Sequence, residues 1–108
     1  MILLVLLLLT RTYHVVAIRD LPTSLRTHVA ITGRVTSVRH EADGDWHIWV
    51  SDGRVKIVVE IIPLIPVPVP RVGACVQVRG IRRIDAERGH AHRVEIHPAE
   101  QLLVMPCP

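Results

Sequence analysis

Residues 43–62 read DGDWHIWVSDGRVKIVVEII and contain two Asp-Gly pairs that flank a short alternating segment. Asp-Gly favours tight turns between antiparallel strands, because glycine tolerates the positive φ that such turns require. Between the two pairs, every second residue from Trp46 to Val50 is apolar, which is the period of a half-buried strand. The stretch therefore predicts a meander, with one strand before the first turn and another after the second.

The same alternation continues on both sides of this stretch. Upstream, residues 27–40 alternate over the length of a long strand, and Gly33 in its middle predicts a bulge or a sharp bend. Downstream, Gly80 marks a similar bend in a strand that follows a proline-rich segment. The five predicted strands span residues 27–40, 45–51, 54–62, 74–84 and 91–97.

The proline-rich segment, residues 63–70, contains four prolines. Proline fixes φ and lacks a backbone donor, so we expect an extended crossover here and neither a helix nor a central strand. A long bent first strand, a meander and this crossover predict an all-β, five-stranded Greek-key barrel of the OB type over residues 27–100. An SH3-like barrel is the closest alternative. We expect the fifth strand of the barrel to pair with the first.

The composition agrees with strands and indicates a modestly basic surface. The chain of 108 residues has room for one domain, and 49% of it is hydrophobic without any Phe, so Val, Ile, Leu and Ala must form the core. Lys and Arg total 13, of which 12 are Arg, against 10 Asp and Glu. Guanidinium groups pair well with phosphate or carboxylate, but a net charge of +3 does not establish a nucleic-acid partner.

Both ends of the chain are apolar. Residues 1–19 form a leader whose eight consecutive aliphatic residues are too few to span a bilayer, so we expect no transmembrane anchor. The leader fits either a signal peptide or a segment packed on the barrel, and we favour export over a cytoplasmic location. Residues 20–26 are predicted as a linker and residues 101–108 as a tail, and the apolar ends also fit pairing in a homo-oligomer.

Cys75 is expected to be a small buried hydrophobe, and a bridge to Cys107 is the alternative if the protein is exported.

Four strings of the sequence carry a resemblance to a known group of proteins. They are DGDWHIWV, VEIIP, VRG and VEIHP, at residues 43–50, 59–63, 78–80 and 94–98. Together they resemble small bacterial OB-fold proteins, many of them exported and of uncharacterised function. The resemblance covers roughly residues 27–100 and implies an OB barrel with generic nucleic-acid binding of the tRNA-anticodon-domain-like kind. It supplies no catalytic residues, and the proline-rich segment stands where these proteins usually have a helix.

The outward face of the second and third predicted strands is where barrels of this type usually bind their ligands. Trp49 is the candidate for stacking on a base, and packing against the barrel is the alternative. A second basic patch surrounds the loop between the last two strands. The candidate nucleic-acid-binding residues are Arg34, Trp49, Arg54, Lys56, Arg82, Arg83, Arg88 and Arg93. We therefore predict a module that binds single-stranded nucleic acid, DNA included, weakly and without sequence preference; an exported envelope module for protein, glycan or metal is the alternative.

A polar set shares the outward parity of its strands: Asp45, His47, Glu60, Glu95 and His97. Because we expect the fifth strand to pair with the first, not all five need to converge. His47, Glu60 and His97 are the candidate ligands of a zinc ion, and mutual hydrogen bonding is the alternative. No nucleophile stands visibly beside a base, so we predict neither enzymatic activity nor a cofactor.

Overall fold

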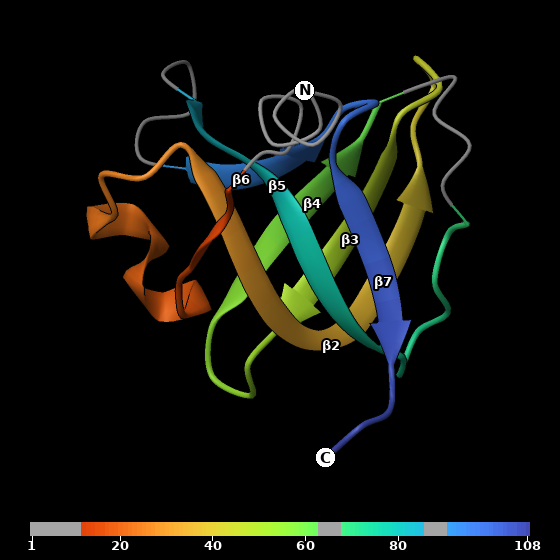
Figure 1. The fold of residues 1–108 in the computed structure, drawn as a ribbon. Helices are drawn as coiled ribbons and strands as arrows, with labels where there is room; N and C mark the ends of the chain where they lie inside the picture. The colour runs from red at the N-terminus through yellow and green to blue at the C-terminus, as the bar shows by residue number, and fades with distance from the viewer. Residues whose placement is uncertain (1–11, 63–67, 86–90) are drawn as a thin grey trace, which may run out of the picture.

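Five strands close a barrel in the computed structural model, which describes residues 12–62, 68–85 and 91–108 (Figure 1). The barrel strands are β2 (His28–His40), β3 (Trp46–Ser51), β4 (Lys56–Ile61), β5 (Cys75–Asp85) and β6 (Ala91–Ile96). β2, β3 and β4 form an antiparallel meander, β6 runs parallel to β4 and antiparallel to β5, and β5 closes onto β2. This arrangement confirms the predicted all-β barrel of the OB type.

The fifth barrel strand does not lie where the sequence analysis placed it. β6 lies between β4 and β5, with Val58 opposite Arg93 on one side and Ile81 opposite Glu95 on the other. The strand that closes the barrel against β2 is β5, the fourth barrel strand. Alternation along a strand predicts which face is buried but not which strand lies beside it, so the expected pairing of the fifth strand with the first was wrong.

The two Asp-Gly pairs form the turns of the meander. Gly44 and Gly53 have φ values of 97° and 102°, which L side chains rarely adopt. In the second turn, the Asp52 carboxylate accepts hydrogen bonds from the backbone N–H groups of Val55 and Arg54, and these bonds lower the pKa of Asp52. The turn chemistry therefore explains why the meander forms at these positions.

The barrel interior is filled by the apolar residues of the alternating pattern. Fully buried side chains come from every barrel strand, among them Ile31, Ile48, Val59, Val78 and Ile96. Gly33 and Gly80 allow neighbouring strands to approach closely, because a Cβ atom there would lie 2.6 Å from the Ser51 carbonyl oxygen and 2.5 Å from a Val94 methyl carbon, respectively. The register shift in β2 occurs between Val35 and Ser37, just beyond Gly33.

The chain on either side of the barrel packs against it. The short strand β1 (His14–Val15) runs parallel to β2, and the 3₁₀ helix η1 (Ile18–Thr23) buries Ile18 and Leu21 in the core. At the other end, β7 (Gln101–Met105) pairs with β5, although the sequence predicted no structure for this segment. Among the residues described, no helix is both long and apolar enough to cross a membrane.

A disulfide between Cys75 and Cys107 ties the tail to β5, with 5.2 Å between the two Cα atoms. The structure therefore adopts the alternative considered for Cys75 and not the free buried thiol. Bridges that close loops of this order typically stabilise a fold by about 2–4 kcal/mol. Part of the proline-rich crossover, residues 63–67, lies outside the described residues, and Pro68–Pro70 is neither helix nor strand.

Candidate functional site

The outward side chains of β3, β4 and β6 form two neighbouring rows. The register places His47, Glu60 and Glu95 in one row, and Trp49, Val58 and Arg93 in the next. A groove of about 530 Å³ crosses these rows, and its lining includes residues of both. The face predicted to bind a ligand is therefore hollowed, with an acidic end and an aromatic end.

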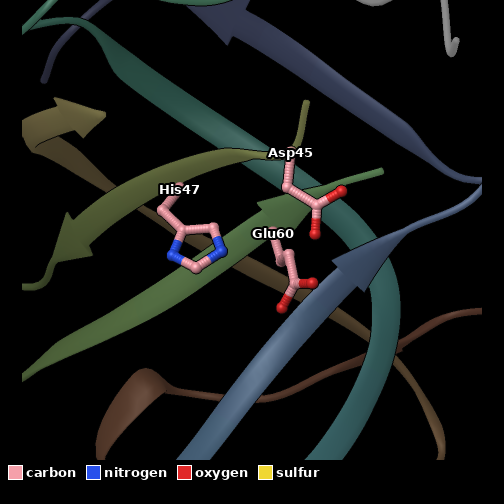
Figure 2. Close-up of side chains that lie close together, drawn as sticks. All are labelled: Asp45, His47 and Glu60. Atoms are coloured by element: carbon pink, nitrogen blue, oxygen red, sulfur yellow. The ribbon is translucent and has the colours of Figure 1, made fainter. Parts of the chain in front are cut away.

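At the acidic end, Asp45, His47 and Glu60 form a group that we call the Asp45 cluster (Figure 2). Each residue offers one potential metal-ligand atom, and these atoms all lie within 4.8 Å of one another. Asp45 directly precedes β3 and is only 8% exposed. The His47 ring turns one nitrogen toward the two carboxyl groups, while its Nδ1 lies 3.1 Å from a carboxylate oxygen of Glu41.

The electrostatics of Glu60 reflect this crowding. Burial of its carboxyl group, the hydrogen bond with Asp45 and the negative charges around it raise the pKa of Glu60 to about 7. Arg93 opposes the shift, since its Nε lies 3.2 Å from Glu60 Oε2, but does not cancel it. Glu60 therefore holds its proton to a higher pH than an ordinary glutamate does.

Glu95 is the register partner of Glu60 and has the opposite environment. Its carboxylate accepts hydrogen bonds from Arg83 Nε at 3.2 Å and Arg93 Nε at 2.9 Å, and His97 Nε2 lies 2.9 Å from it. Burial alone would raise the pKa of Glu95, but the contacts with His97, Arg93 and Arg83 outweigh it and lower the pKa. We call Arg83, Arg93, Glu95 and His97 the Glu95 cluster.

The structure separates the three residues that the sequence singled out as zinc ligands. His47 and Glu60 come together, but His97 lies in the Glu95 cluster and faces a carboxylate there. Asp45 takes the third place beside His47 and Glu60. Its signal was present in the sequence, because Asp45 has the same parity as His47, although it precedes the first residue of β3.

The residues predicted to contact nucleic acid also lie in different places, and only some of them line the groove. Trp49 is 39% exposed and lines the groove together with Lys56 and Arg93. Arg54 is exposed in the turn next to this end. Arg34 instead lines a second groove of about 310 Å³.

The basic patch around the last loop is largely occupied by protein partners. Arg83 and Arg93 contact Glu95, and the Nε of Arg82 donates to the carbonyl of Arg26. Arg88 lies outside the described residues. The described part of this patch therefore presents less free positive charge than the sequence indicates.

Two further groove residues were not identified from the sequence. Arg39 is exposed on β2, opposite His47, and pairs with Glu41 at 2.6 Å. His92 lines the groove from β6, and its buried Nδ1 has no hydrogen-bond partner among the described residues. The sequence did not identify either residue as part of the groove, because that depends on which strands lie next to each other.

Comparison with known proteins identifies the fold. No family model matches the sequence, and no curated protein matches it. Among solved structures, the tetrameric p202 HIN2 is similar with a TM-score of 0.71 and 10% identity, over 90% of this chain and 52% of that one. An Entamoeba histolytica aspartyl-tRNA synthetase has a TM-score of 0.62 and 16% identity, over 87% of this chain and 22% of that one.

A replication protein A heterotrimer bound to single-stranded DNA is also similar, with a TM-score of 0.59 and 13% identity. The likeness covers 80% of this chain and 63% of that one. In each of these three cases the chain spans less than two thirds of the structure that it resembles. At such low identities the likenesses show a shared fold, and what the site binds has to be argued from its own residues.

Proposed function

We propose that this chain is a binding module for nucleic acid and not an enzyme, and that it holds a single strand in the groove over β3 and β4. The observation that carries the proposal is the exposed Trp49, which lies in this groove with Lys56 beside it. An exposed indole next to a cation suits a base and its phosphate. The similar structures support the class of ligand, since one is bound to single-stranded DNA and another is a tRNA synthetase.

The geometry also sets the strength of this binding. One stacked base contributes roughly 1–3 kcal/mol, and the groove offers one exposed tryptophan. Arg83 and Arg93 already contact carboxylates, and the Asp45 cluster repels phosphate from the acidic end. We therefore expect weak binding without sequence preference, with bases at Trp49 and phosphates near Lys56.

The test is a titration of tryptophan fluorescence with an oligothymidylate of about 12 nucleotides, within the range that single OB barrels cover. At low salt we expect quenching that saturates. If about two phosphates are contacted, the logarithm of the affinity falls with the logarithm of salt concentration with a slope near −1.4. A duplex of matched length should bind more weakly.

Variants locate the contact. Trp49→Leu keeps Trp46, which packs against the core and stacks on His40, as an internal reference that should not respond to DNA. Lys56→Ala should reduce the salt slope, whereas Arg34→Ala, in the second groove, serves as the matched control. Equal quenching in Trp49→Leu and the parent protein, or none at low salt, would refute the proposal.

A second candidate function draws on the disulfide. Stable disulfides are typical of oxidising compartments, so the Cys75–Cys107 bridge favours an exported envelope module that binds protein, glycan or metal. Mass spectrometry of protein from its native host distinguishes the two candidates. Cleavage of the leader together with a mass lower by two hydrogens supports export, and an intact Met1 with two free thiols excludes it.

A further inference from the structure

The Asp45 cluster combines an imidazole with two carboxylates, which is a donor set for divalent metals. Ligand atoms about 2.1 Å from a tetrahedral ion are separated by about 3.4 Å. The ligand atoms of the cluster lie within 4.8 Å of one another. Small rotations of side chains that border an open groove are enough to close this difference.

The imidazole is already held in the orientation that a ligand requires. Nδ1 of His47 faces the Glu41 carboxylate at 3.1 Å, so the other ring nitrogen points toward Asp45 and Glu60 (Figure 2). Histidines that bind metals almost always donate their second N–H to a carboxylate or carbonyl in this way, which fixes the tautomer. Glu41 therefore occupies the position of such an orienting partner.

The environment of Asp45 is an independent observation. Its side chain is among the few buried acidic ones, with the residue 8% exposed. The Asp45 carboxylate faces the Glu60 carboxyl group, with which it shares a hydrogen bond, and a ring nitrogen of His47 lies within 4.8 Å of its ligand atom. A buried carboxylate that faces a second carboxyl group is costly, in contrast to Glu95, which faces three donors. A cation at this point would offset the cost for two carboxylates at once.

We propose that Asp45, His47 and Glu60 bind a divalent transition-metal ion of the Zn²⁺ class, with Glu41 orienting His47. The nitrogen ligand favours such ions over Mg²⁺ and Ca²⁺, which prefer oxygen ligands throughout. Because all three ligands line the groove, a further coordination position faces the open side. That position is available to water or to an oxygen ligand in the groove. This inference does not depend on nucleic-acid binding, and its test contains no oligonucleotide.

The experiment is a calorimetric titration of the full chain with zinc chloride at neutral pH, after treatment with a chelator and dialysis. We expect one tight site per chain. Asp45→Asn and Glu60→Gln should each weaken it by more than about 100-fold, and Glu41→Gln by about 10- to 100-fold, as is usual for orienting partners. His97→Ala is the matched control, because His97 faces Glu95 outside the cluster, and it should leave the affinity unchanged.

A second measurement separates lost binding from lost folding. Without metal, Asp45→Asn removes a buried charge and should unfold at the same or a higher denaturant concentration than the parent protein. Zinc should raise the unfolding midpoint of the parent protein and leave that of Asp45→Asn in place.

Three results would overturn the proposal. They are an absence of saturable zinc binding, equal affinity in the parent protein and Asp45→Asn, and tighter binding of Ca²⁺ or Mg²⁺ than of Zn²⁺. Equal affinity would mean that zinc binds at other histidines of the chain.

Discussion

Glu60 and Glu95 lie opposite each other in neighbouring parallel strands, yet their carboxyl groups have opposite pKa shifts. Both side chains are mostly buried, with 17% and 11% exposed, so burial does not explain the difference. Glu95 is surrounded by donors, whereas Glu60 faces the carboxyl group of Asp45 and shares one guanidinium with Glu95. The number of donors around each carboxylate decides the sign of its shift.

This difference gives the two clusters different physical roles. The Glu95 cluster is internally satisfied and connects β5 to β6, as a structural element does. The Asp45 cluster has excess negative charge and an open groove beside it, as binding sites do. Substitutions that remove one carboxylate at a time should therefore change stability in opposite directions.

The largest expected effect is that of Glu95→Gln. Glutamine has no negative charge and only one acceptor oxygen to offer Arg83, Arg93 and His97, so we expect a loss of about 2 kcal/mol in the free energy of unfolding. Urea denaturation at neutral pH measures it. Glu41→Gln, which removes a more exposed carboxylate that faces Arg39 and His47, is the control and should cost less than about 1 kcal/mol. A similar small cost for Glu95→Gln would show that the cluster does not stabilise the fold.

Glu60→Gln should have the opposite effect, which grows as pH rises from 4.5 to about 7. The pKa of Glu60 is raised from 4.5 to about 7, so below pH 4.5 its carboxyl group is protonated in both the folded and the unfolded state. Between these values the folded state keeps a proton that the unfolded state has released, so stability falls as pH rises and the loss is complete above pH 7. Without metal, Glu60→Gln should therefore be more stable than the parent protein at alkaline pH by roughly 1–2 kcal/mol, after allowance for solvent screening.

The measurement is denaturation of both proteins across this pH range with a chelator present. The difference between the two curves cancels the titration of the histidines, which are common to both. The advantage of Glu60→Gln should disappear at acidic pH. A difference that is constant with pH would contradict the raised pKa of Glu60.

Much of the fold was predictable because its causes are local. Alternation and the Asp-Gly turns placed the second and third predicted strands within two residues of β3 and β4. The strand β7 could not be predicted in this way. Its residues form a short apolar run without clear alternation, and among them only Leu102 is buried. Its position depends on β5 and on the bridge from Cys107, which are not local to it.

For the site, the sequence predicted which face of the sheet the side chains share, but not which side chains contact one another. Parity grouped Asp45, His47, Glu60, Glu95 and His97 on one face; the register places His47, Glu60 and Glu95 in one row, and Asp45 lines the same groove. Which of them meet depends on β6 lying next to β4, a long-range pairing without a signature in the alternation. For that reason, the opposite environments of Glu60 and Glu95 could be recognised only in the structure.

Arg93→Gln tests the connection between the two clusters. Its guanidinium lies 3.2 Å from Glu60 Oε2 and 2.9 Å from Glu95 Oε2, so its loss should raise the pKa of both carboxyl groups. Because Arg93 is partly exposed, we expect a cost of only about 1 kcal/mol in the free energy of unfolding. Carbon-detected NMR of the side-chain carboxyl groups measures both pKa values. A rise for Glu95 alone would show that Arg93 does not act on the Asp45 cluster.

The smallest expected effect is that of His97→Ala, which removes one of the three donors of Glu95 and leaves both arginines in place. We expect a cost below about 1 kcal/mol and a rise in the pKa of Glu95. Since a lowered pKa contributes stability that is lost as pH falls through it, this variant should begin to lose stability at a higher pH than the parent protein. The pKa of Glu60 should not change, because His97 contacts Glu95 and does not contribute to the pKa shift of Glu60. A shift of Glu60 as large as that of Glu95 would mean that the two carboxylates titrate as one unit and that the distinction between the clusters is wrong.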